Sequence, residues 1–138
     1  DIYNNAGDNP PNDDENYASA YSSGDIIGIA LDLDNNKLYF SKNGQWSNGS
    51  GSWDSTTFNS STGVVTITAP ASTNNGHYLF ASGDYQSGAA PTFEWNFGGT
   101  QSFTISSGNA DDNGYGNFEY DVPTGFYSLN TKNLAEFG

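Results

Sequence analysis

Side chains that could carry acid–base or nucleophilic chemistry are few in this chain. His77 is the only histidine, and both cysteine and arginine are absent. A nucleophilic serine or cysteine needs a base held beside it, and no motif places a nucleophile next to His77. The acidic residues lie mainly in Asn- and Gly-rich stretches, where solvated carboxylates are commoner than the paired carboxylates of a glycosidase. The sequence therefore predicts a protein that is not an enzyme.

Oxygen-rich stretches raise the question of calcium, which prefers carboxylate and amide ligands. Residues 32–36 read DLDNN, and residues 111–114 read DDNG. Neither stretch has the full EF-hand spacing with its terminal glutamate, and residues 34–36 also suit a hairpin turn. No other cofactor is indicated. Calcium is thus a hypothesis, with ligands at Asp111, Asp112 and Asn113, or alternatively at Asp13 and Asp14.

Aromatic side chains in polar loops form a second kind of candidate site. In a sugar site, an aromatic ring typically stacks on the apolar face of the sugar while amides and carboxylates bind its hydroxyls. The alternative is that each ring packs over the end of the fold, which is the commoner role for a single tryptophan. The candidate ligand-binding residues are Trp46, Asn48, Trp53, Tyr85 and Tyr115.

The charge balance excludes several classes of partner. Sixteen acidic residues face three lysines, which gives a net charge of −13 at pH 7. This charge repels the phosphates of nucleic acids and the surface of anionic membranes. Membrane insertion is not expected either, because no apolar run approaches the ~20 residues of a membrane span. Without cysteine there is no disulfide framework.

The elements that must position these side chains read as short strands. In residues 25–33, apolar residues recur at every second position, which is the period of a half-buried strand. Residues 37–41 suit the partner strand after a two-residue turn at Asn35-Asn36, and Asn43-Gly44 is a second tight-turn signal. The pattern therefore predicts a β-hairpin over residues 24–44.

Beyond the hairpin, the sequence alternates between strand-like and polar stretches and shows no helical periodicity. Residues 45–62 and 106–117 read as loops. We expect further strands at 64–68, 77–81, 91–97 and 101–105, and a short one around 118–122. In 91–97, three aromatic residues alternate with polar ones and form a single aromatic face. The predicted fold is all-β, an antiparallel β-sandwich of jelly-roll type.

The amino-acid sequence of the hairpin, GDIIGIALDLDNNKLYFSKNG, resembles the central strand–turn–strand of SPRY domains. The WNFGG of residues 95–99 looks like the closing strand of that family. The resemblance spans roughly residues 20–105 and implies a sandwich whose loops bind partners. The matching hairpin positions are Asp25, Gly28, Asp32, Phe40, Asn43 and Gly44.

The tail PTGFYSLNTKNL is similar to an ending found after SPRY-like modules in large bacteriophage virion proteins. The resemblance implies a tail-fibre, spike or decoration component on the extracellular virion surface. It also implies other virion chains as partners, a homo-oligomer, and host-surface glycan as a ligand. The matching positions are Pro123, Gly125, Phe126, Leu129, Thr131, Asn133 and Leu134.

One departure from the family concerns the front of the fold. SPRY domains carry a longer run of strands before the hairpin, whereas 24 residues precede it here, so we expect a sandwich that is incomplete on its N-terminal side. The expected organisation is a polar arm (1–24), a SPRY-like core (25–105), and a loop, short strand and connector to a following segment (106–138). The alternatives are a peptide-binding SPRY domain and an accessory carbohydrate-binding module of a carbohydrate-active enzyme.

Overall fold

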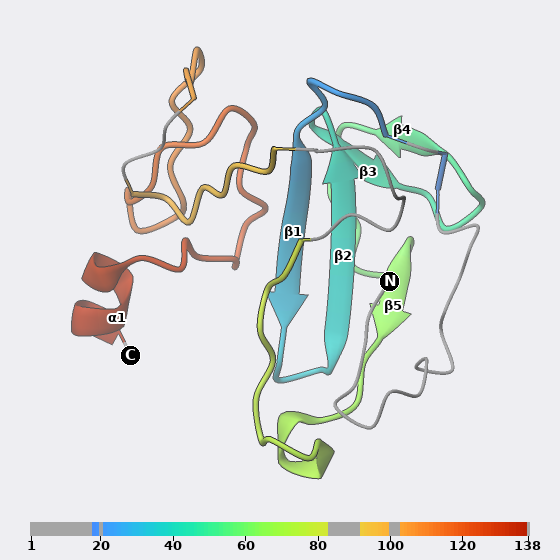
Figure 1. The fold of residues 1–138 in the computed structure, drawn as a ribbon, viewed down its shortest axis with the longest axis vertical. Helices are drawn as coiled ribbons and strands as arrows, with labels where there is room; N and C mark the ends of the chain where they lie inside the picture. The colour runs from blue at the N-terminus through green and yellow to red at the C-terminus, as the bar shows by residue number, and fades with distance from the viewer. Residues whose placement is uncertain (1–17, 20, 83–91, 100–102, 138) are drawn as a thin grey trace. The chain divides into compact units, whose positions relative to one another are not determined.

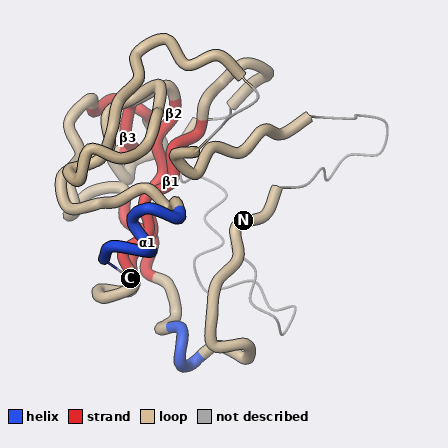
Figure 2. The backbone as a smooth tube through the Cα atoms, turned by 90° about the vertical axis from the view of Figure 1, so that its left-hand side faces the viewer, coloured by secondary structure: helices blue, strands red, loops and turns tan. Residues whose placement is uncertain are grey.

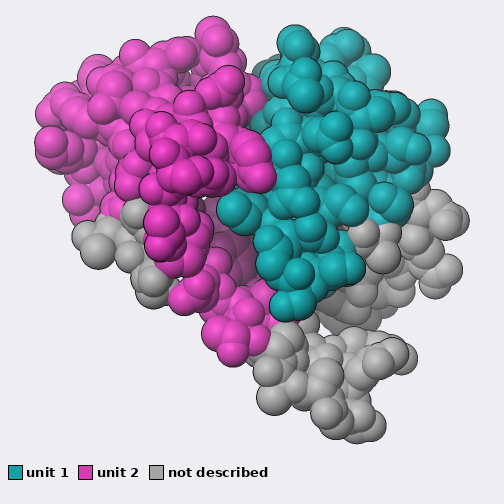
Figure 3. All heavy atoms as spheres, turned by 90° about the horizontal axis from the view of Figure 1, so that it is seen from above, with its two compact units in different colours: residues 1–78 teal, residues 79–138 magenta. Residues whose placement is uncertain are grey.

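The computed structural model describes residues 18–19, 21–82, 92–99 and 103–137. Its regular structure is mostly antiparallel β-sheet with little helix, which confirms the predicted all-β class. The chain divides into two compact units, residues 1–78 and 79–138, shown in two colours in Figure 3. In the described part of the chain, no helix is both long and apolar enough to cross a membrane.

A five-stranded antiparallel sheet makes up the regular part of the first unit (Figure 1). The order is β1-β2-β3-β4, and β5 pairs with β2 as well. β3 and β4 fall inside the stretch 45–62 that was predicted as a loop, so that prediction was too simple. The strands are β1 (Ile27–Asp32), β2 (Lys37–Lys42), β3 (Gln45–Ser47), β4 (Trp53–Ser55) and β5 (Val64–Thr66).

The predicted hairpin forms, and its two turns differ in kind. β1 and β2 pair without a break from Ile27↔Lys42 to Asp32↔Lys37, so four residues (33–36) make the first turn instead of two. Only Asn36 of that turn has a positive φ, at 56°. At the second turn, Asn43 (φ 51°) and Gly44 (φ 77°) make the predicted tight turn, which leads into the unpredicted strand β3. Positive φ at both central residues is the signature of a type I′ hairpin turn.

Both faces of the β1–β2 ribbon are covered in part. On one face, Leu38, Val65 and Ile67 form the buried cluster, with Leu31 and Phe40 packed against it. On the other face lies Tyr39, which is 2% exposed. Its ring makes an edge contact with Phe58, at 4.9 Å between centroids. Because side chains alternate across a strand, Leu38 and Tyr39 of β2 contribute to the packing on opposite faces of the ribbon.

The second unit is mostly irregular (Figure 2). The strands predicted at 77–81, 91–97 and 101–105 are absent from the described residues of those stretches. Instead, Asn109 and Phe118 form an isolated antiparallel bridge. A strand persists only when a neighbouring strand satisfies its backbone groups. Alternation alone could not supply that neighbour.

A helix that the sequence did not predict closes the second unit. α1 (Thr131–Phe137) begins after Asn130, whose Oδ1 accepts hydrogen bonds from the backbone N–H groups of Lys132 and Asn133, both at 3.0 Å. Asparagine is a strong N-cap residue because its side-chain oxygen satisfies these first donors. The cap was the available signal, and seven residues are too few to show a helical period.

Candidate functional site

Two motif residues 18 positions apart close the base of the hairpin. Asn43 Nδ2 donates to Asp25 Oδ1 at 2.7 Å, and Asn43 Oδ1 accepts from the backbone N–H of Ile26 at 2.9 Å. The backbone N–H of Ser22 donates to Asp25 Oδ2 at 2.7 Å. The bond from Ser22, followed by that from Asn43, lowers the pKa of Asp25. We call the Asp25–Asn43 pair the hairpin clamp.

Two further motif residues of the hairpin, Asp32 and Gly28, also have structural roles. Asp32 accepts two hydrogen bonds from Asn35, from its side chain at 2.7 Å and its backbone at 2.9 Å, and these lower the pKa of Asp32. Gly28 faces Ser41 so closely that a Cβ atom there would collide with Ser41 Oγ. The oxygens of residues 32–36 therefore shape a turn, which favours the turn reading of DLDNN over the calcium reading.

Three of the predicted ligand-binding residues, Trp46, Asn48 and Trp53, lie on or directly beside the β3–β4 ribbon. Trp53 donates from Nε1 to the carbonyl of Ser19 at 2.6 Å, and Lys42 Nζ lies 6.0 Å from the Trp53 ring centroid. Asn48 Nδ2 donates to Asp54 Oδ2 at 2.5 Å. Asp54 follows Trp53 in β4, and successive positions face opposite sides of a strand, so the Asn48–Asp54 pair is separate from the indole. An indole with an ammonium nearby offers a sugar a stacking surface and a hydrogen-bond donor. We call Lys42 and Trp53 the ribbon site.

Trp46 contributes to packing instead. Its ring meets Phe58 edge-on at 5.0 Å, and the Trp46 side chain is half-buried. Trp46 pairs with Ser55 whereas Trp53 pairs with Ser47, so the two indoles occupy successive ladder positions, with a register shift between them. Successive positions face opposite sides of a sheet. The two tryptophans therefore do not form one platform.

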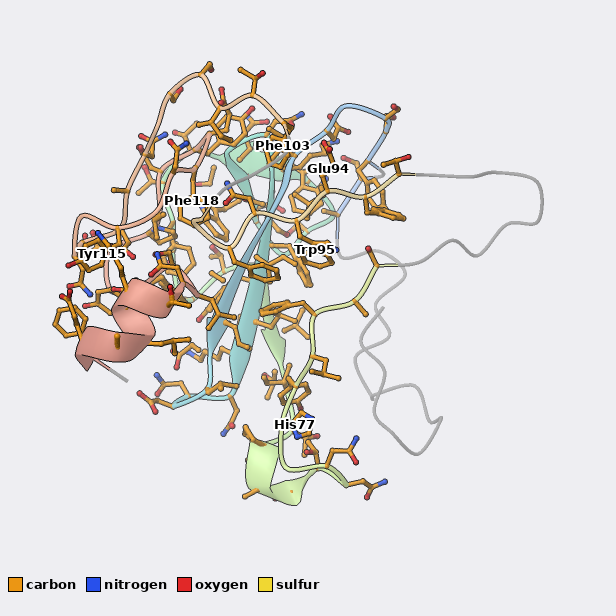
Figure 4. The ribbon with its side chains drawn as sticks, turned by 60° about the vertical axis from the view of Figure 1, so that its left-hand side comes forward. His77, Glu94, Trp95, Phe103, Tyr115 and Phe118 are labelled. Carbon is orange, nitrogen blue, oxygen red and sulfur yellow. The ribbon has the colours of Figure 1, made fainter. Side chains whose placement is uncertain are left out.

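The remaining predicted residues lie away from the ribbon. Tyr115 belongs to the second unit, where its hydroxyl donates to Glu136 Oε2 at 2.8 Å and its ring lies 5.1 Å from Lys132 Nζ. The bond to Glu136 raises the pKa of Tyr115. Figure 4 shows Tyr115 beside α1. Tyr85, and the alternative calcium ligands Asp13 and Asp14, lie outside the described residues.

Asp111 is a buried hub of hydrogen bonds, with 7% of its surface exposed. Oδ1 accepts from the backbone N–H groups of Asn113 (3.0 Å) and Tyr115 (2.9 Å). Oδ2 accepts from the backbone N–H of Ser128 (2.8 Å), from its hydroxyl (2.7 Å) and from Asn133 Nδ2 (2.7 Å). Burial on its own raises the pKa of this carboxyl, but the bonds from Ser128, Tyr115 and Asn133 outweigh it and hold the pKa well below its usual range.

This arrangement bears on the calcium hypothesis. A carboxylate offers about four lone-pair sites, and five donors already occupy those of Asp111. Asp112 Oδ2 accepts from the backbone N–H of Gly125 at 2.9 Å, and Asn113 Nδ2 donates to Asn133 Oδ1 at 2.9 Å. Among the described residues, no group of three or more His, Cys, Asp or Glu side chains could hold a metal ion. The geometry favours a structural role for Asp111, and calcium binding stays a hypothesis.

Two features were not among the predicted site residues. Phe80, Trp95 and Phe97 lie together and are exposed; the alternation in PTFEWNF pointed to this face without saying that it would stay open. Asn133 is a matching position of the tail resemblance, but nothing in the sequence indicated that its amide would be buried, since an asparagine in a polar tail is ordinarily solvated.

No family model, curated protein or solved structure matches the chain.

Proposed function

We propose that this chain is a non-enzymatic SPRY-like sandwich module of a bacteriophage virion surface protein, such as a tail fibre, spike or decoration component. Its role is to display loops on a β scaffold and to assemble with other virion chains. Recognition of host-surface glycan through the ribbon site is the second part of the proposal.

The hairpin clamp is the observation that carries the first part. Asp25 and Asn43 belong to the motif on which the resemblance rests, and they are each other's hydrogen-bond partners across the hairpin. Asp32 has an equally specific structural task at Asn35, and Gly28 leaves room for the Ser41 hydroxyl. Conformational need thus accounts for the motif residue by residue, as expected when the resemblance reflects a common scaffold.

The ribbon site supports the glycan part. Trp53 is partly exposed and fixed by its bond to Ser19, so an incoming sugar need not order the indole. A net charge of −13 favours neutral glycans over sialylated or phosphorylated ones.

A glycan array of neutral oligosaccharides tests the ribbon site. We expect binding that Trp53→Ala lowers at least tenfold, because the stacking surface is lost. Tyr127→Ala is the control, since Tyr127 is 56% exposed and belongs to the other unit. Binding that survives Trp53→Ala, or no binding at all, would contradict glycan recognition at this site.

The complete reading frame that encodes the chain tests the virion assignment separately. Fibre or capsid-binding modules on either side would support it. A flanking glycosidase domain would favour the accessory carbohydrate-binding alternative, and flanking signalling domains would favour the peptide-binding SPRY alternative.

A further inference from the structure

An exposed aromatic cluster lies in the second unit. The Trp95 and Phe97 rings are parallel within 1°, with centroids 5.7 Å apart. Phe80 lies against both, at 6.2 Å from Trp95 and 5.9 Å from Phe97. These spacings fall within the range at which aromatic pairs attract one another. We call these three residues the aromatic cluster.

The cluster is mounted on a fixed backbone. Asn96 alternates with Trp95 and Phe97; its Nδ2 donates to the carbonyl of Asn117 at 2.8 Å, and its Oδ1 accepts from the N–H of Gly98 at 2.8 Å. Trp95 Nε1 donates to Ser82 Oγ at 3.2 Å, which restrains the indole. Polar bonds thus tie one side of this extended stretch to the unit, and the other side presents rings.

Those rings are open. Phe80 and Trp95 are each 38% exposed, Phe97 is 39% exposed, and Phe93, at the preceding alternate position, is 43% exposed. Aromatic side chains present about 150–250 Å² each, so the four together expose roughly 240–400 Å². The upper part of this range is comparable to the largest patch on a typical monomer, and such patches often mark an interface. Tryptophan is also among the residues that dominate binding energy at protein interfaces.

The net negative charge of the second unit limits which partners could bind the aromatic cluster. Residues 79–138 carry seven acidic side chains and one basic one, Lys132. Glu94 lies in the aromatic stretch itself, next to Trp95 (Figure 4). A second copy of the chain would bring a further −13 to the interface. Opposite charges across an interface speed association, whereas like charges oppose it. The acidic side chains are Asp84, Glu94, Asp111, Asp112, Glu119, Asp121 and Glu136.

We propose that the aromatic cluster is the docking site for a segment of a partner protein in which apolar side chains alternate with lysine or arginine. The apolar side chains cover Phe80, Trp95 and Phe97, and the basic ones face Glu94 and the net negative charge of the unit. This inference deepens the assembly role proposed above and rests on it.

Two fluorescent peptides serve as probes: one alternates leucine with lysine, and its twin alternates leucine with glutamate. Fluorescence anisotropy with the whole chain gives their dissociation constants. We expect the lysine peptide to bind, more weakly as salt rises, and the glutamate peptide not to bind. Trp95→Ser should weaken binding of the lysine peptide at least tenfold because it removes the centre of the cluster. Phe80→Ser should also weaken it, and guards against a folding defect confined to one variant.

Tyr21→Ser is the matched control, since Tyr21 is 62% exposed and belongs to the other unit, so its loss should leave peptide binding unchanged. Equal binding of both peptides, no binding, or a dissociation constant that Trp95→Ser leaves unchanged would overturn the proposal. Self-association in sedimentation velocity that strengthens with salt and disappears in Trp95→Ser would also overturn it, in favour of a second copy. The glycan array and the reading frame do not involve Trp95, so the failure of either proposal is recognisable separately.

Discussion

At the scale of single residues, Asp111 shows how an acidic side chain stabilises a unit that has little apolar core. A buried carboxylate is costly unless its charge is compensated. Here backbone and side-chain donors from three segments of the chain converge on it. Hydrogen bonds to this carboxylate therefore connect stretches that are not paired as strands in the described part of the chain.

Asp111→Asn tests this role. The substitution places an NH2 group where one carboxylate oxygen accepts at least two hydrogen bonds, so the donors at that oxygen lose their partner. We expect a loss of about 2–3 kcal/mol in the free energy of unfolding, measured by urea denaturation. Asp121→Asn, at an exposed site, should change it by less than about 0.5 kcal/mol. Equal effects of the two substitutions would contradict the hub.

The same residue predicts how stability depends on pH. The pKa of Asp111 is lower in the folded chain than in the unfolded chain, where it lies near 3.9. Its stabilisation is thus fully present above about pH 5 and declines as pH falls toward the folded pKa. Wild type should lose stability more steeply than Asp111→Asn between about pH 5 and 3. Parallel curves would show that other carboxyls dominate acid unfolding.

Among the secondary-structure elements, α1 reverses the usual pattern of an amphipathic helix, because it buries a polar side chain and exposes apolar ones. Asn133 is buried and bound to Asp111 and Ser128, whereas Leu134 and Phe137 are 56% and 66% exposed. An ordinary surface helix buries its apolar stripe. Polar bonds at Asn133, the bond from the Tyr115 hydroxyl to Glu136 and the cap at Asn130 therefore hold α1 in place.

Neighbouring positions on α1 provide a matched test. Asn133→Leu should destabilise the chain by about 2–3 kcal/mol, although leucine is the better helix former, because Asp111 loses a donor in a buried site. Leu134→Gln should change stability by less than about 0.5 kcal/mol because that side chain is already exposed. Thermal unfolding followed by circular dichroism measures both. Greater loss at Leu134 would mean that apolar packing holds the helix.

At the scale of the whole molecule, charge is the dominant property. With a net charge of −13 and three lysines, acidic residues repel one another far more than they pair. Such repulsion keeps a protein soluble and weakens its compact state.

Salt should therefore stabilise this protein at neutral pH. Raising the salt concentration from about 0.01 M to 0.15 M shortens the Debye length from about 30 Å to about 8 Å. We expect Tm to rise on the order of 3 °C in calorimetry at pH 7. Near the sequence isoelectric point of about 4.1, the same change should have little effect because the net charge vanishes. A Tm that falls with salt at pH 7 would show that attractive ion pairs prevail.

The hairpin could be predicted from the amino-acid sequence because the signals that specify it are local. Alternation fixed which side chains share a face of β1 and β2, and Asn43-Gly44 fixed a turn that requires two positive φ angles. Alternation also indicated that Phe93, Trp95 and Phe97 share a face. The length of the first turn was missed because the side chain of Asp32 caps it from outside the turn.

Only the tertiary structure decided which segments meet. Whether an alternating stretch becomes a strand depends on a neighbour that satisfies its backbone, and residues 92–97 have no ladder partner among the described residues. The meeting of Asp111 with Ser128 and Asn133 depends on contacts 17 and 22 positions apart, for which one sequence carries no spacing rule. Composition gives the net charge of this protein, and the alternation of apolar residues indicates its all-β fold class. Long-range packing decides which carboxylate is buried among hydrogen-bond donors and which aromatic side chains stay exposed.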